Sequence, residues 1–293
     1  MNMIFKIELM KLKYLLKSRL MLIIYAVLHV WLGVLFIDYS IFSTKSLLSF
    51  SVAGLITASI YSYNYITDVD EDKINPMKSP LIRGELTVRE LTVFSFLLFI
   101  ISIIVSVMTS FRVFIFIIFI IIISFIYSYP LLQGLKYRRF KDVPFLKTVT
   151  ISTIWGMVFL IPFFATNTKV TFGAILFVIF LIIQTFIDST ISDIRDISED
   201  SKQQIKTIPI LLKDKTNGFL FSLNTISILP ILYGIYHDII PIYFSVFLIQ
   251  ILIQYYTIYY IKYTKSVNHV YTKIRPFGLI LLLTSLVYLR YFS

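Results

Sequence analysis

The chain has 293 residues, of which 58% are hydrophobic and 15% charged, and its formal net charge is +11. Soluble domains carry about 25% charged residues, and runs such as 113–126 and 240–261 are too long and too uncharged for a soluble core. A soluble enzyme is therefore excluded, and a β-barrel would show short alternating segments instead. The composition predicts an all-α membrane protein, because helices satisfy their own backbone hydrogen bonds in lipid.

At about 20 apolar residues per crossing, the hydropathy predicts nine transmembrane helices. In chain order they cover residues 19–37, 46–66, 91–110, 113–130, 146–166, 170–190, 218–236, 239–261 and 277–292. No soluble domain fits between them, so we expect a single polytopic domain over residues 1–293. The absence of cysteine excludes disulfides and thiolate metal sites.

The basic residues gather in alternate loops, as nine transmembrane helices would require. Most of the 27 Lys and Arg residues precede the first helix or follow an even-numbered one, whereas Lys45, Arg112, Lys169 and Arg290 occupy the other side. The positive-inside rule then predicts a cytoplasmic N-terminus. The net charge follows from this topology and from attraction to anionic lipid, so no nucleic-acid partner is expected.

Scarce acidic residues gather in two segments, 64–80 and 188–209, at the predicted cytoplasmic ends of the second and sixth helices. The two segments form a pseudo-repeat, because Asp68, Asp72 and Lys78 have the same spacing as Asp196, Asp200 and Lys206. A single acidic segment is often only a solvated loop start. Two with matched spacing on the same side of the membrane indicate a shared role.

The spacing of these acids suits a metal–diphosphate site. Asn64, Asp68 and Asp72 recur every four residues, so they project from one face if the helix continues, and Asp196 and Asp200 do likewise. Carboxylates this close repel unless a cation lies among them. Oxygen ligands of this kind suit Mg²⁺ that also contacts a substrate phosphate. Following basic residues can donate to the remaining phosphate oxygens.

With these motifs the sequence resembles the UbiA superfamily of intramembrane prenyltransferases. The first motif is matched by Asn64, Asp68 and Asp72 with the following NPMKSPLIRG, the second by DIRDISED (residues 193–200) with IKTIP, and a third segment by Tyr127, Tyr129, Pro130 and Lys136. The chain departs from the family pattern at Ser79, where many members have arginine, and at Ser192, where many have asparagine.

The resemblance implies nine transmembrane helices in a ring around a central cavity, with an active site opening to the cytoplasmic side. It implies Mg²⁺-dependent transfer of an isoprenyl group from a prenyl diphosphate to a hydrophobic, typically aromatic, acceptor through an allylic carbocation. The metal ligands would be Asp68, Asp72, Asp196 and Asp200, supported by Asn64. The diphosphate contacts would be Lys78, Lys136, Arg195 and Lys206. Tyr127 and Tyr129 would flank the donor or the carbocation, although packing is an equal alternative for both.

Asp188 lies in an i+4 polar series with Gln184 and Ser192. It lies about 12 Å deeper than Asp196 along the helix, where a carboxylate is costly without a partner. Two roles stay open: it lines the acceptor pocket and takes or orients a proton, or it is a protonated acid that makes an interhelical hydrogen bond.

Two other functions remain as alternatives. An ion-coupled carrier would place its acids near the bilayer midplane, whereas these acids cluster at one face. Phosphoribosyl transfer to a polyprenyl phosphate on the same scaffold is disfavoured by the complete second motif. Acceptor identity and prenyl chain length are not readable from the residues.

Overall fold

The structure, a computed structural model, describes residues 3–69, 73, 79–130, 139–202, 205–264 and 267–292. The described residues contain helices and no β-strand. They belong to two compact units, one formed by Met1–Lys141 with Met157–Lys169 (unit 1) and the other by Asp142–Gly156 with Val170–Ser293 (unit 2).

Six helical segments of the described chain are long and apolar enough to cross a membrane. They are Thr44–Thr67, Val88–Thr109, Phe111–Ser128, Phe172–Ser198, Ile208–Tyr236 and Ile242–Thr264. Each overlaps one of the nine expected spans, so the all-α membrane class is confirmed. The count of nine, the ring and the orientation of the N-terminus remain predictions.

The other three expected spans correspond to helices that are shorter than expected or divided in two. The first and the last correspond to the shorter apolar stretches Leu20–Phe36 and Phe277–Arg290. The span expected over 146–166 is two helices, α6 (Leu146–Val158) and α7 (Ile161–Thr166). Pro162 lies in the first turn of α7. Proline has no backbone N–H to donate and suits the start of a helix, which accounts for a new helix beginning here.

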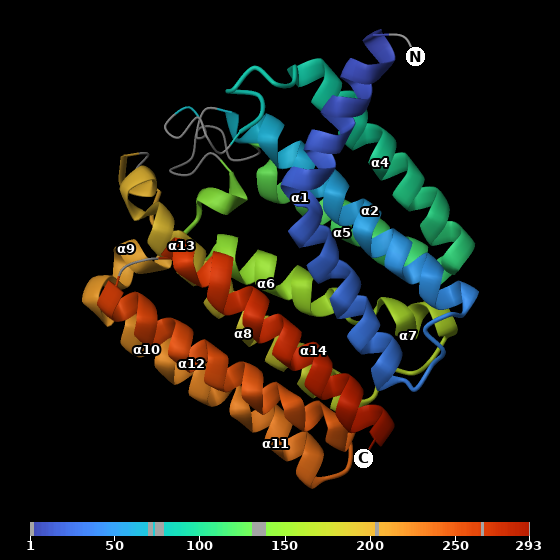
Figure 1. The fold of residues 1–293 in the computed structure, drawn as a ribbon, viewed down its shortest axis with the longest axis vertical. Helices are drawn as coiled ribbons and strands as arrows, with labels where there is room; N and C mark the ends of the chain where they lie inside the picture. Colours follow the sequence, from blue (N-terminus) through green and yellow to red (C-terminus); the bar gives the residue numbers. More distant parts are fainter. Residues whose placement is uncertain are drawn as a thin grey trace. The chain divides into compact units, whose positions relative to one another are not determined.

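In unit 1, α2 (Thr44–Thr67) packs against α1 (Met3–Phe36) and α4 (Val88–Thr109), and α5 (Phe111–Ser128) packs against α4 (Figure 1). Small residues at such contacts let helix backbones approach closely in lipid. The buried Ser59 of α2 donates its hydroxyl hydrogen bond to the carbonyl of Ser95 on α4 at 3.0 Å. Large side chains of α4 such as Phe96 and Met108 are exposed, as expected of a face that meets lipid.

In unit 2, α8 (Phe172–Lys202) contacts α10 (Thr216–Ile226) and α11 (Ile228–Tyr236). The helix α12 (Phe247–Thr264) contacts both α10 and α14 (Arg275–Phe292). Unit 2 also contains most of α6. Its shorter elements are η4 (Ile242–Val246), α9 (Ile208–Leu212), η3 (Lys213–Lys215), α13 (Val267–His269) and the π-helical turn η5 (Val270–Ile274). The remaining short helix, η2, covers Phe140–Asp142.

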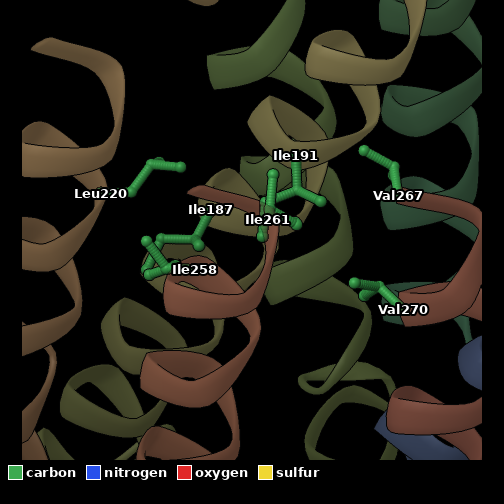
Figure 2. Close-up of a cluster of buried hydrophobic side chains, with 7 residues drawn as sticks. All are labelled: Ile187, Ile191, Leu220, Ile258, Ile261, Val267 and Val270. Atoms are coloured by element: carbon green, nitrogen blue, oxygen red, sulfur yellow. The ribbon is translucent and has the colours of Figure 1, made fainter. Parts of the chain in front are cut away.

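A buried apolar cluster holds the helices of unit 2 together. It consists of Ile187, Ile191, Leu220, Ile258, Ile261, Val267 and Val270. Figure 2 shows Ile187 and Ile191 of α8 lying against Ile258 and Ile261 of α12. Because Ile187 immediately precedes Asp188 in α8, this packing fixes the helix that carries the second acidic motif.

Candidate active site

The first acidic motif lies at the end of α2 in unit 1. We expected Asn64, Asp68 and Asp72 to share one face of a continuing helix, but α2 ends at Thr67 and Asp68 is its C-cap. The Thr67 carbonyl accepts a hydrogen bond from Arg139 Nη1 at 3.2 Å. A side-chain donor at the last carbonyls is a normal way to satisfy a helix end. Asp72 lies outside the described residues.

Cations surround the Asp68 carboxylate. Lys141 Nζ donates to Asp68 Oδ1, and Arg139 Nη1 lies 3.7 Å from the same oxygen. Both basic side chains are mostly buried. Thr67 Oγ1 donates to this oxygen as well, at 3.0 Å. Asp68 is therefore held in a pocket of positive charge by a segment more than seventy residues further along the chain.

Asn64 is oriented by α5. The Ser128 hydroxyl donates to Asn64 Oδ1 at 3.2 Å, so Asn64 is tied to the end of the neighbouring helix. Tyr127 and Tyr129 flank this serine; Tyr127 is half-buried, and Tyr129 is the exposed C-cap of α5. Lys78 and Lys136, the basic residues expected near this motif, lie outside the described residues.

The second acidic motif lies on one unbroken helix in unit 2. Because α8 continues to Lys202, Asp188, Asp196 and Asp200 share its i+4 face as expected. Arg195, which we expected to contact diphosphate, donates to both carboxylate oxygens of its neighbour Asp196, at 3.0 and 3.3 Å, and to Ser192 at 3.3 Å. Asp200 is buried, while Lys206 is exposed beyond the end of α8.

A buried ion pair joins α8 to α6. Asp193 is only 2% exposed, and Lys147 Nζ donates to its Oδ1 at 2.7 Å. Its Oδ2 is buried with no hydrogen-bond donor among the described residues. The two helices approach closely enough that a Cβ on Gly156 of α6 would lie 2.5 Å from Ile182 Cγ1 of α8. The rest of α6 is therefore held against α8, which keeps Lys147 near the motif.

Asp188 is committed to neighbouring helices. Its Oδ1 accepts from Arg275 Nη2 of α14 at 2.6 Å and from Gln254 Nε2 of α12 at 2.8 Å. The interhelical alternative for Asp188 is thus present in the structure, as a pair with arginine. Gln184, one turn earlier, donates to Asn224 and Ser227. Polar contacts of this kind join helices in membranes.

Three basic residues near the motifs were missed as site residues by sequence reasoning: Arg139, Lys141 and Lys147. They were counted only toward the charge of their loop. The available signal was their position in the basic run YRRFK (residues 137–141) and at the start of the fifth predicted helix. Within the described residues, to which Asp72 does not belong, no three acidic, histidine or cysteine side chains converge on a metal position.

Comparison with known proteins identifies the family. A family model described as the UbiA prenyltransferase family matches residues 26–283. Among curated relatives, a digeranylgeranylglyceryl phosphate synthase of Thermococcus gammatolerans is 26% identical over 204 residues, which cover 67% of this chain and 70% of the relative. The synthase of Thermococcus kodakarensis is 30% identical over 195 residues, covering 65% of this chain and 66% of the relative.

Solved structures share the fold. A UbiA homolog from Archaeoglobus fulgidus bound to GPP and Mg²⁺ has a TM-score of 0.73 at 17% identity, covering 94% of this chain and 97% of that one. A structure described for digeranylgeranylglyceryl phosphate synthase has a TM-score of 0.67 at 21% identity, covering 94% and 98%. Because the family model also spans most of the sequence, this chain belongs to the UbiA prenyltransferase family and is an enzyme of that class.

Proposed function

We propose that this protein transfers an isoprenyl group from a prenyl diphosphate to a glycerophosphate lipid and releases pyrophosphate. The observation that carries the proposal is the cationic surrounding of Asp68, where Lys141 and Arg139 converge on a carboxylate at a helix end. Carboxylates beside lysine and arginine provide both halves of a metal–diphosphate site. The acids bind the metal, and the bases donate to phosphate oxygens.

Mg²⁺ is the metal that this donor set fits. Asp68, Asp72, Asp196 and Asp200 offer carboxylate oxygens and Asn64 an amide oxygen, which are hard ligands that Mg²⁺ prefers. The ion pairs of Asp68 with Lys141 and Arg139 support this proposal, because they place basic side chains beside a candidate metal ligand. When bound, the metal would stabilise the negative charge that grows on the departing diphosphate.

Basic side chains would bind the phosphate oxygens that the metal does not contact. Arg139 and Lys141 join Lys78, Lys136, Arg195 and Lys206 in this role. Arg139 and Lys141 lie beside Asp68, so their charge is directed at the proposed anionic site. Such preorganised charge lowers the barrier to ionisation because little needs to reorient as charge develops.

A bilayer-embedded site would protect the allylic carbocation. Water would trap it, whereas an apolar surrounding leaves the acceptor as the available nucleophile. We propose that the site opens toward the cytoplasm, where the soluble diphosphate headgroup can enter, while the isoprenyl chain stays among apolar side chains.

The names of the relatives support one acceptor class. Sequence reasoning alone favoured an aromatic acceptor, but the curated relatives are named for digeranylgeranylglyceryl phosphate. We therefore propose a prenylated glycerol phosphate, whose free hydroxyl would attack the carbocation and form an ether.

The test uses the purified full-length protein in nanodiscs. It would be incubated with GPP, farnesyl diphosphate or geranylgeranyl diphosphate, each with a geranylgeranylglyceryl phosphate or an aromatic acceptor, with Mg²⁺ or with EDTA. Mass spectrometry of the lipid product and pyrophosphate release are the readouts. We expect an ether product from the glycerophosphate acceptor only when Mg²⁺ is present. Product from an aromatic acceptor alone would overturn the acceptor class, and no pyrophosphate release with any pair would overturn the prenyl transfer.

A further inference from the structure

A groove runs along the surface of unit 2 between α12 and the segment formed by η5 and α14. Its volume is about 480 Å³, and it is lined by Ile249, Leu252, Ile253, Tyr256, Lys273, Ile274 and Phe277. Lys273 is the only charged residue among the described residues of that lining. The volume is within the range of sites that hold small molecules. A groove with one cation and otherwise apolar or aromatic walls has the chemistry of a lipid site.

Helix geometry separates this groove from the polar contacts of Asp188. Successive helical residues turn by about 100°, since there are 3.6 residues per turn. Ile249, Leu252, Ile253 and Tyr256 therefore share one side of α12, while Gln254, which donates to Asp188, lies on another. These helices have an inner polar side and an outer groove side.

The same separation holds for the two basic residues next to α14. Arg275 donates to Asp188 at 2.6 Å, so its charge is compensated inside unit 2. Lys273 lies two positions earlier, roughly on the opposite side of the helix, and it is exposed on the groove. Lys273 and Ile274 belong to the π-helical turn η5. Such turns are rare and often occur at functional sites.

Beside the groove the two helices meet closely. A Cβ on Gly278 of α14 would lie 3.0 Å from Ile253 Cδ1 of α12, so glycine permits that contact. Leu252 and Phe277 are exposed by 66% and 68%, so their side chains stand as walls open to the outside. From Ile249 to Tyr256 the groove follows about 10 Å of helix, which is about a third of the hydrocarbon thickness.

We propose that this groove binds one anionic phospholipid of the bilayer, with an acyl chain along the apolar walls and its headgroup phosphate on Lys273. Charge complementarity favours anionic over zwitterionic lipid, because only the former brings a net negative charge to Lys273, the charged residue among the described groove walls. Lysine near a membrane surface attracts anionic lipid. This site does not depend on the proposed transfer reaction and involves none of its residues.

Native mass spectrometry of the detergent-purified chain tests the proposal. The probes are palmitoyl-oleoyl phosphatidylglycerol and phosphatidylcholine, which share acyl chains and differ in headgroup charge. We expect the wild-type chain to bind one phosphatidylglycerol more tightly than phosphatidylcholine. Lys273→Gln should weaken phosphatidylglycerol binding about five-fold, equivalent to about 1 kcal/mol, and leave phosphatidylcholine unchanged. Inorganic phosphate should not displace the lipid, since it lacks the chain.

Matched controls separate the groove from general effects. Lys262→Gln removes a lysine in the last turn of α12, whose ammonium lies 5.4 Å from the centre of the Tyr263 ring and not in the groove. This variant should keep the preference for phosphatidylglycerol over phosphatidylcholine. Leu252→Trp should fill the groove and weaken both lipids, whereas Leu229→Trp on α11, at a similar exposure of 63%, should not. Equal binding of the two lipids, or equal losses in Lys273→Gln and Lys262→Gln, would overturn the proposal.

Discussion

The two acidic motifs have matched spacing in the sequence but different local structure. In unit 1 the helix ends at the motif, and Asp68 is a C-cap held by Arg139 and Lys141 from a distant segment. In unit 2 the helix passes through the motif, and Asp196 is held by Arg195 of the same helix. Equal spacing therefore does not impose equal backbone structure. The Thr67 carbonyl at the end of α2 accepts a hydrogen bond from Arg139, whereas α8 continues through its motif to Lys202.

The largest expected effect concerns catalysis by the two motifs together. Asp68→Asn and Asp196→Asn should each lower kcat about 100-fold to 1,000-fold, since each removes a charge proposed to act on the leaving diphosphate. Because residues that act as a unit are non-additive, the double variant should be little worse than either single one. Steady-state prenyl transfer in nanodiscs measures this.

The matched control for these variants is Asp214→Asn, which changes an exposed aspartate in η3 and should leave the rate unchanged. Multiplying losses in the double variant would show that the two motifs act independently, and the shared-diphosphate proposal would then be abandoned.

The second prediction concerns buried charge. Lys147→Gln should lower the free energy of unfolding by about 3 kcal/mol, because it leaves the buried Asp193 carboxyl group without its cation. Lys141→Gln should cost less, because Asp68 keeps Arg139 and is more exposed than Asp193. Thermal unfolding in detergent, followed by circular dichroism, compares the two variants.

Adding Asp193→Asn to Lys147→Gln should recover much of the lost stability, because the uncompensated charge is then gone. If Lys141→Gln lowered the free energy of unfolding more than Lys147→Gln, burial of the carboxyl group would not decide how much each ion pair contributes.

The third prediction separates the two roles of Asp188. Asp188→Asn should lower stability by about 2 kcal/mol, since Arg275 loses its carboxylate while Gln254 keeps an oxygen acceptor. A double-mutant cycle with Arg275→Gln should give a coupling of at least about 1 kcal/mol. Transfer kinetics measured on the same variants show whether Asp188 also acts on the acceptor. Unchanged kcat and acceptor KM would remove the pocket role and leave the interhelical one.

The smallest effect is expected at two serines, one beside each acidic motif. Ser128→Ala removes the donor to Asn64 and should cost about 0.6 kcal/mol, the average for such bonds in membranes. Ser192→Ala removes only a long contact to the exposed Arg195 and should be near neutral. Chemical unfolding in mixed micelles resolves the pair. A larger loss from Ser192→Ala would mean that the second motif depends on its side-chain contacts more than the first.

Much of this protein was determined by the sequence alone. Long uncharged runs leave helices as the only way to satisfy the backbone in lipid, and six of the expected spans overlap helices of sufficient length in the described chain. The family was also readable, because Asn64, Asp68 and the second motif are local patterns that survive without knowledge of packing, and the family match confirms it.

Only the tertiary structure decided which partner each charge has. Lys147 and Asp193 are 46 positions apart, and Arg275 and Asp188 are 87 apart. Nothing in local spacing links such residues, because helix periodicity predicts neighbours only within one or two turns. The end of α2 was missed for the same reason, since the donor to the Thr67 carbonyl comes from Arg139. Chemistry that depends on composition and short spacing was predictable, whereas pairing across helices required the fold.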